Sequence, residues 1–244
     1  VYRGQAYLPV EAARDEQRSA EWKAEYLEGV RIPMGRDNYG NLVVWDLANP
    51  STPHMLVCGA TGSGKSVCLR STLEYALEAG IPAVVLDPKY EFTDAGARAT
   101  VYSETEEIEA EMKRLVKEMQ GRVRRHENSL TLVIFDEFAD ALSQSRSGRE
   151  LDIRGTNLMT GKTVTVGREK SLEENLRILA QKGRSVGYRI VAATQRASTK
   201  IITGDTKTNF PVQVCFRMPK ALDSRIVLDE DGAEALKGHG DGLM

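Results

Sequence analysis

The sequence predicts an α/β fold in which a mainly parallel sheet is flanked by helices. Two observations lead to this prediction. Short apolar runs alternate with segments of helical periodicity, as in a chain built from strand–helix–strand units. The predicted strands lie at residues 55–58, 83–87, 132–136, 190–194 and 212–217. Glycine-rich or polar segments follow several of these strands, and the carboxyl ends of parallel strands are where such folds bind ligands.

Length and composition restrict the class of protein. The chain has 244 residues, enough for one large α/β domain with small appendages. With 28% charged and 41% hydrophobic residues it is neither disordered nor fibrous. The formal net charge of -2 excludes a globally basic nucleic-acid binder but not a local basic surface. No apolar run approaches the ~20 residues of a membrane-spanning helix, so we expect no membrane segment.

Cysteine and histidine residues give no sign of a metal centre. Three cysteines without paired spacing indicate buried thiols in a reducing compartment, and we expect a cytoplasmic protein. The three histidines, His54, His126 and His239, are scattered singly, and we interpret them as structural or surface residues.

The first 30 residues are predicted to be a helical extension of the main domain. Residues 11–27 are rich in Ala, Glu, Arg and Lys and indicate a helix that ends at Gly29. Residues 31–37, a turn at 38–41 and a strand at 42–47 then predict a small β-element. We expect the main domain to cover residues 31–244.

A phosphate-binding loop follows the first buried strand. The segment reads Gly59, Ala60, Thr61, Gly62, Ser63, Gly64, Lys65, Ser66 and Val67. It fits the pattern G-x-x-x-x-G-K-[ST] between a strand and a helix, the context that makes a chance glycine-rich turn improbable. Glycines let backbone N–H groups surround a phosphate, and the helix N-terminus adds partial positive charge. Lys65 is predicted to reach the β- and γ-phosphates of ATP, and the Ser66 hydroxyl to bind Mg²⁺.

A second signal ends the apolar strand at residues 130–135. The strand is followed by Asp136-Glu137, which in company with a phosphate loop predicts an ATP-hydrolysing site. Asp136 is expected to hold Mg²⁺ and Glu137 to activate the attacking water as a general base. Between the two motifs, residues 104–127 have helical periodicity, and Ser103 with Glu106 predicts a capping box.

Residues 143–170 interrupt the strand–helix alternation and are predicted to be an insertion. Residues 157–159 and 163–166 flank Thr160-Gly161, which indicates a hairpin. Basic residues outnumber acidic ones here; a solvated insertion is the favoured interpretation, and a contact with DNA or a partner the alternative. Ser171 with Glu174 then caps a helix that ends near Arg184, and a loop with Arg196, Lys200 and Lys207 follows the strand at 188–195.

Several motifs in a common order resemble the FtsK/SpoIIIE family of DNA translocases from about residue 31 to the end. The matching segments are 53–67, Asp87-Pro88-Lys89 with Glu91, 136–140, 193–196, 202–211, 223–229 and 238–241. The resemblance implies a RecA-like motor core that assembles as a hexameric homo-oligomeric ring around double-stranded DNA. The family also includes conjugative and mobile-element motors, which fits the unusual insertion.

The resemblance also implies roles for individual residues. Gln195, beside the phosphate loop, would sense the γ-phosphate. Arg184 lies where related ring motors place an arginine finger that reaches the neighbouring subunit's nucleotide. The alternative interpretation of Arg184 is a cap at the C-terminus of a surface helix. Arg196, Lys200 and Lys207 lie in the family's pore loop and would grip DNA phosphates, with a solvated loop as the alternative.

Two other functions remain open from the sequence. A protein-secretion or conjugative coupling ATPase related to FtsK would share the fold and the ATP site. A non-catalytic nucleotide switch is disfavoured by Glu137, which hydrolysis needs.

Overall fold

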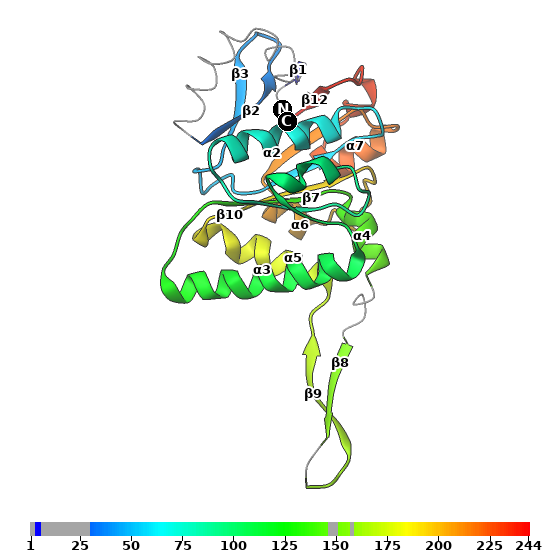
Figure 1. The fold of residues 1–244 in the computed structure, drawn as a ribbon. Coiled ribbons are helices and arrows are strands. Elements are labelled where there is room, and N and C mark those ends of the chain that lie inside the picture. Colours follow the sequence, from blue (N-terminus) through cyan, green and yellow to red (C-terminus); the bar gives the residue numbers. More distant parts are fainter. Residues whose placement is uncertain (1–2, 6–29, 146–150, 157–158) are drawn as a thin grey trace.

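The computed structural model describes residues 3–5, 30–145, 151–156 and 159–244. Within these residues, the central sheet has eight strands in the order β1-β12-β11-β4-β10-β7-β5-β6 (Figure 1). They are β1 (Arg3–Gln5), β12 (Asp241–Leu243), β11 (Val212–Phe216), β4 (Met55–Cys58), β10 (Tyr188–Thr194), β7 (Thr131–Phe135), β5 (Ala83–Leu86) and β6 (Thr100–Tyr102). Neighbours from β11 to β6 are parallel, whereas β12 is antiparallel to β11 and β1. The predicted mainly parallel α/β sheet is confirmed.

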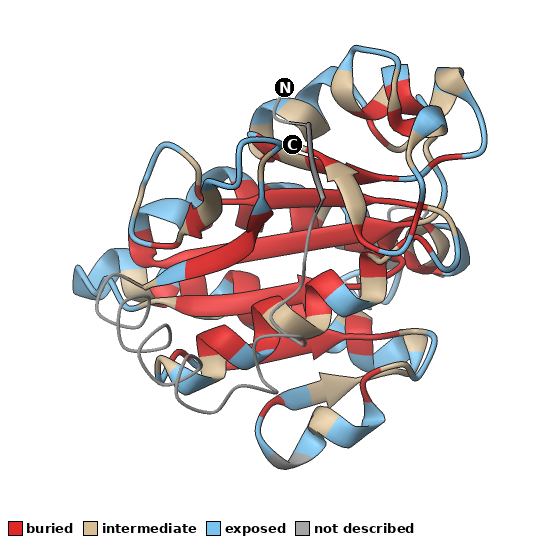
Figure 2. Cartoon of the chain, turned by 90° about the horizontal axis from the view of Figure 1, so that it is seen from above, coloured by how far each residue is buried: buried red, intermediate tan, exposed pale blue. Residues whose placement is uncertain are grey.

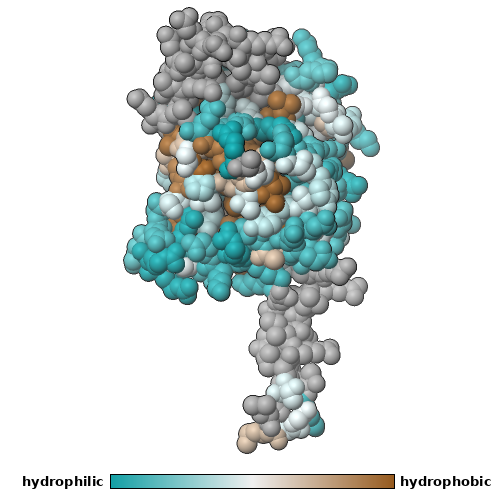
Figure 3. All heavy atoms as spheres, in the orientation of Figure 1, coloured by the Kyte–Doolittle hydropathy of each residue, from teal (hydrophilic) through white to brown (hydrophobic). Residues whose placement is uncertain are grey.

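Helices cover both faces of the sheet. They are α2 (Lys65–Glu78), α3 (Thr105–Arg125), α4 (Phe138–Gln144), α5 (Leu172–Gly183), α6 (Gly204–Asn209) and α7 (Ala221–Leu228), with 3-10 turns η2 (Thr93–Ala97), η4 (Arg184–Val186) and η5 (Ala233–Ala235). Alternate strand residues face opposite sides, so Leu56 and Val133 join the apolar core with α3 and α5, while Val57 and Ile134 join the core with α2. Figure 2 shows the strands buried between these layers. The outer surface over α3 is mainly hydrophilic (Figure 3).

Two hairpins flank this core. Strands β2 (Arg31–Arg36) and β3 (Leu42–Asp46) pair antiparallel beside α2, which confirms the small β-element. The predicted helix at residues 11–27 lies outside the described residues. None of the helices in the described part of the chain has the length and apolar character that crossing a bilayer requires.

The second hairpin projects from the domain beyond α4 and α5 (Figure 1). Strands β8 (Leu151–Thr156) and β9 (Thr163–Glu169) pair antiparallel, with Thr156 opposite Thr163. The hairpin is confirmed, and its described pairing extends to Thr156 and Thr163. Residues 157 and 158 of the strand expected at 157–159 lie outside the described residues.

Helix capping was predicted correctly in one case of two. The Ser171 hydroxyl accepts from the Glu174 N–H at 3.1 Å and caps α5. The capping box at Ser103 is wrong: the N-cap of α3 is Glu104, and no side chain caps this helix end. The Glu104 carboxylate instead accepts a hydrogen bond from the Tyr90 hydroxyl.

His54 is a structural residue, as predicted, and its ring joins two elements in the core. The side chain is fully buried; Nδ1 accepts from the Ile190 N–H at 3.0 Å, and Nε2 therefore donates to the Ala180 carbonyl at 2.9 Å. Burial lowers the pKa of this imidazole to about 4, although the Ala180 carbonyl opposes the shift. The neutral ring is thus part of the folded state.

We expect acid to destabilise the domain through His54. Between pH 6.5 and about 4 the unfolded imidazole binds a proton that the folded one refuses, so stability falls as pH falls in this window. From pH 7 to pH 5 this residue should remove about 2 kcal/mol of the free energy of unfolding. Urea titrations at several pH values measure the slope. His54→Gln should flatten it, whereas His126→Asn, at an exposed position with left-handed backbone, should not; equal slopes in all three proteins would refute the assignment.

Candidate nucleotide-binding site

The phosphate loop connects β4 to α2 at the carboxyl edge of the sheet. Its backbone is fixed by the Ala60 N–H, which donates to the Arg217 carbonyl at 3.0 Å, and by the Ser63 N–H, which donates to Ala60 at 3.1 Å. A Cβ at Gly59 would lie 2.5 Å from Ser63 Oγ, and one at Gly64 would lie 2.8 Å from the Gly240 backbone. Gly64 also has a φ of +114° at the start of α2, where no side chain caps the helix. The free N–H groups of this helix end suit a phosphate group.

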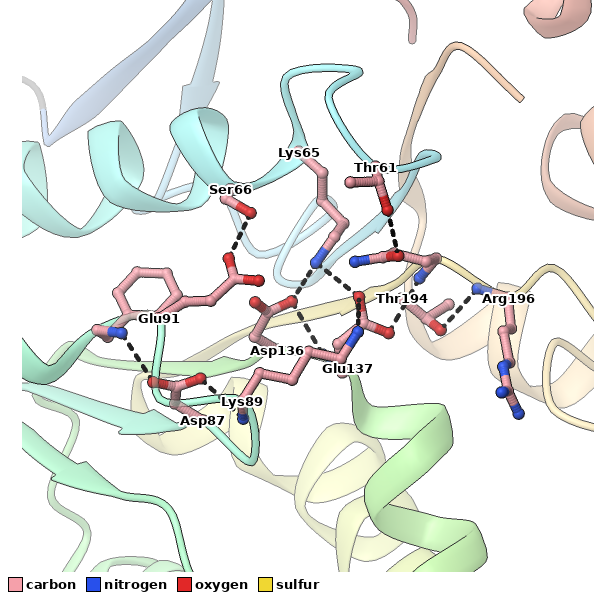
Figure 4. A network of polar contacts seen from close by, with 12 residues as sticks. Thr61, Lys65, Ser66, Asp87, Lys89, Glu91, Asp136, Glu137, Thr194 and Arg196 are labelled. Carbon is pink, nitrogen blue, oxygen red and sulfur yellow. Dashed lines mark hydrogen bonds and ion pairs between the residues drawn. The ribbon is translucent and has the colours of Figure 1, made fainter. Parts of the chain in front are cut away.

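The loop lysine meets the acidic pair at the tip of β7. Strand β10 separates β4 from β7, and the parallel register brings all three carboxyl ends to one edge. Lys65 Nζ contacts Asp136 Oδ1 and lies 2.9 Å from Glu137 Oε1 (Figure 4). Exposed fractions are 3% for Lys65 and 0% for both carboxylates. The structure thus places two motifs 71 residues apart in sequence in direct contact.

Electrostatics in this cluster favour the charged lysine. Burial opposes the ammonium of Lys65, but Asp136 and Glu137 outweigh it and raise the pKa of Lys65. Burial also opposes ionisation of Glu137, yet Lys65 prevails and lowers the pKa of that carboxyl, with a smaller contribution from Lys89. At Asp136 burial prevails over Lys65, and the pKa is raised. A further positive or multivalent charge beside Asp136 would favour its ionised form.

The donor set fits a divalent cation held together with a phosphate group. Asp136 Oδ2 is buried and has no hydrogen-bond partner among the described residues, although its partner oxygen accepts from the Glu137 N–H at 2.9 Å. No cluster of three or more His, Cys, Asp or Glu in the described part of the chain is arranged to hold a metal alone. Mg²⁺ typically takes one or two protein ligands and completes its shell with phosphate and water. Asp136 with Ser66 suits that role.

Two further residues reach the cluster from the segment after β5. Glu91 Oε2 accepts from the Ser66 hydroxyl at 2.7 Å, and Lys89 Nζ lies 3.5 Å from Glu137 Oε1. Asp87 shapes this segment by accepting from the Phe92 N–H at 2.7 Å. No individual role was predicted for Lys89 or Glu91 from the sequence. Their place directly after a buried parallel strand was the signal that could have identified them.

Gln195 follows β10 and lies between the loop and the acidic pair. Its Oε1 accepts from the Thr61 hydroxyl at 2.9 Å, and its backbone N–H donates to Glu137 Oε2 at 3.2 Å. Gln195 therefore contacts both motifs, the phosphate loop through its side chain and the acidic pair through its backbone. Figure 4 shows Thr61, Lys65 and Glu137 turned toward a common space.

Arg184 lies away from these residues. It begins η4, just before β10, and is exposed. Because the phosphate loop and Gln195 lie at the carboxyl ends of β4 and β10, Arg184 is at the opposite edge of the sheet. Arg184 therefore cannot contact a nucleotide bound at the phosphate loop of its own chain.

The three predicted DNA-contacting residues lie on or near the segment after β10, and two of them have carboxylate partners. Arg196 is exposed and pairs with Asp140 of α4 at 3.4 Å. Lys200 is exposed. Lys207 pairs with Asp229 at 2.7 Å. The prediction that Lys207 lies in a loop is wrong, because the residue belongs to the short helix α6, which Thr203 caps.

A cavity of about 290 Å³ joins the predicted nucleotide-contacting residues. Its lining includes Lys65, Ser66, Val67, Glu91 and Gln195. This volume is at the lower end of the range of small-molecule sites. A parallel sheet, a phosphate loop at its carboxyl edge and an Asp-Glu pair beside the loop lysine together define a P-loop ATPase domain.

Comparison with known proteins identifies the branch of this class. The family model described as FtsK/SpoIIIE matches residues 13–199. The chain belongs to the FtsK/SpoIIIE family. The DNA translocase SftA of Bacillus subtilis is 33% identical over 86% of this chain and 23% of that protein. The chain spans less than a third of the length of such curated relatives.

Solved structures agree on the fold. The conjugation coupling protein TcpA of pCW3, solved as a monomer with ATPγS, superposes with a TM-score of 0.67 and 27% identity over 86% of this chain and 60% of that chain. The cytoplasmic domain of the type VII secretion ATPase EccC of Thermomonospora curvata gives a TM-score of 0.64 at 21% identity, over 85% of this chain and 26% of that one. The similarity to EccC, at 21% identity, is evidence for the fold alone.

Proposed function

We propose that this chain is the motor domain of an ATP-dependent double-stranded DNA translocase. The observation that carries the proposal is the contact of Lys65 with Asp136 and Glu137 at the carboxyl edge of the sheet. The family and its curated DNA translocases support DNA as the substrate. A cytoplasmic location is part of the proposal, because an ATP-driven motor works where ATP is supplied. Residues 1–30 form an extension, 31–244 the motor domain, and 143–170 an insertion within it.

In this proposal ATP and Mg²⁺ enter the cavity beside the phosphate loop. Bound Mg²⁺ neutralises phosphate charge. Ser66 and Asp136 would hold it, and Lys65 would turn from the carboxylates to the β- and γ-phosphates. Glu137, freed from Lys65, takes a proton from the attacking water. Gln195, whose side chain lies against Thr61 of the phosphate loop, contacts the γ-phosphate.

A hexameric ring explains why Arg184 lies far from its own phosphate loop. In a head-to-tail ring the edge that bears Arg184 faces the nucleotide edge of the next subunit. A guanidinium there stabilises charge on the transferring phosphoryl group. The loop with Arg196, Lys200 and Lys207 then lines the pore and contacts DNA phosphates without reading sequence.

We expect Arg184→Ala to bind ATP normally but to hydrolyse it about 10³-fold more slowly, the usual contribution of an arginine finger. Neighbour complementation tests the role. Arg184→Ala mixed with Lys65→Ala should regain ATPase activity, because one variant supplies an intact site and the other supplies the finger. Arg177→Ala, an exposed arginine on the preceding helix that pairs with Glu174, is the control and should be fully active. An unchanged rate for Arg184→Ala would remove the finger.

The DNA assignment is tested by ATPase rates with and without duplex DNA at low salt. We expect duplex DNA to stimulate turnover, and the stimulation to weaken as salt rises, because phosphate contacts release counterions. Arg196→Ala/Lys200→Ala should lose stimulation but keep the basal rate. Lys117→Ala, an exposed lysine on α3, is the control and should behave as the wild type. No stimulation by DNA at low salt would refute the assignment.

The likeness to TcpA favours a second candidate, a conjugative coupling ATPase. It uses the same site, so the biochemical test above holds for both. If an unfolded polypeptide stimulates ATP turnover and DNA does not, the result indicates a protein-secretion ATPase instead.

A further inference from the structure

The loop between η5 and β12 lies against the phosphate loop. The Gly240 N–H donates to the Ser63 carbonyl at 2.8 Å, and the Gly240 backbone lies so close to Gly64 that a Cβ there would come within 2.8 Å. Strand β12 continues from this loop and pairs with β11, which fixes the loop from its other side. The loop is therefore held in a fixed position beside the phosphate loop, although it lies outside the residues 13–199 that match the family model.

His239, at the centre of this loop, lines the cavity beside the phosphate loop. The cavity of about 290 Å³ is lined by Lys65, Ser66, Val67, His239 and Gly240, among others. A second cavity of about 240 Å³ shares Ala60, Thr61, Gly62 and His239 with the first. The exposed imidazole thus stands where both cavities meet the phosphate loop, and it belongs to no metal cluster among the described residues.

The backbone holds His239 in a conformation that L-residues rarely adopt. Its φ is +54°, between Gly238 at +84° and Gly240 at +96°. A left-handed residue other than glycine persists only where the surroundings determine it, and such positions concentrate at ligand sites. The backbone thus holds the imidazole at the cavity. A residue that only stabilised the fold would not need an exposed aromatic side chain at this place.

We propose that His239 forms the nucleoside wall of the ATP site and stacks on the purine base, opposite Val67. The proposal rests on the proposed nucleotide site. Phosphates bound along the loop place the nucleoside beside the first turn of α2, which carries Val67, a side chain that is 41% exposed. Between a branched aliphatic side chain and an imidazole, a flat base finds two apolar faces. Lys65 and Ser66 hold the phosphate end, and His239 holds the other.

The test compares ATP with inorganic tripolyphosphate, which has the phosphates but no nucleoside. His239→Asn removes the ring and keeps a residue that tolerates left-handed backbone. We expect it to weaken binding of a non-hydrolysable ATP analogue about 5- to 100-fold, as loss of one base–aromatic stack does. Tripolyphosphate affinity should stay within about twofold of wild type, because the ring makes no contact with the phosphates.

Three results are informative. Equal losses for both ligands would show that His239 acts through the shape of the phosphate loop and would overturn the proposal. Unchanged affinity of His239→Asn for the ATP analogue would overturn it as well. A wild-type protein that binds neither ligand would refute the nucleotide site itself, a failure distinct from that of the His239 wall.

Discussion

Glu137→Gln is expected to bind ATP but to hydrolyse it about 10²- to 10⁴-fold more slowly, the contribution of a general base. The amide has the shape of the carboxylate but cannot accept the proton of the attacking water. The substitution preserves the contact of Lys65 with Asp136. The amide oxygen of the new side chain can still accept the hydrogen bond that the Gln195 N–H donates to Glu137 Oε2. The loss should therefore appear in kcat.

Single-turnover hydrolysis and equilibrium binding of ATP measure the two effects separately. Glu173→Gln is the matched control, because Glu173 is an exposed glutamate on α5 and its substitution removes the same charge far from the loop. A Glu137→Gln protein with wild-type turnover would show that another group activates the water.

Lys65→Ala is expected to abolish ATP hydrolysis and to weaken ATP binding more than any other single substitution in the site. The alanine removes the cation that faces the β- and γ-phosphates. It also leaves Asp136 and Glu137 buried side by side without their main counter-charge. Removing one partner of a buried ion pair typically costs about 3–5 kcal/mol, so the folded domain should lose stability too.

A double variant separates the two consequences of this substitution. Lys65→Ala/Glu137→Gln relieves the repulsion between the buried carboxylates, so it should regain part of the lost unfolding free energy without regaining activity. Urea titration and ATPase assays measure both quantities. If the single variant were as stable as the wild type and still hydrolysed ATP, the Lys65–Asp136–Glu137 cluster would have neither of its assigned roles.

The sequence predicted the parts of the fold that depend on burial. Residues 55–58 and 132–135 are buried on both faces of the sheet, so they form continuous apolar runs, and parallel pairing then brings Lys65 to Asp136. Strands β1 and β12 were not predicted. Each has three residues, and the glycines at positions 4 and 242 leave no periodicity to detect.

Contacts between side chains were less predictable than strands. The bond of Ser66 to Glu91 joins α2 to the segment after β5, and no spacing rule connects positions 25 residues apart. The N-cap of α3 is Glu104 and not Ser103, and its side chain contacts Tyr90, a tertiary contact that the local sequence pattern does not contain. The pairing of Arg196 with Asp140 and of Lys207 with Asp229 likewise depends on elements that only the folded chain brings together.

A structure of the domain with Mg²⁺ and a non-hydrolysable ATP analogue tests the central claim most directly. The account predicts that Lys65 Nζ leaves Asp136 and Glu137 for the β- and γ-phosphates, and that the Ser66 hydroxyl leaves Glu91 for the metal. Asp136 should lie beside the same metal ion and Glu137 beside the γ-phosphate. A nucleotide bound elsewhere, or one bound here while Lys65 keeps both carboxylates, would contradict it.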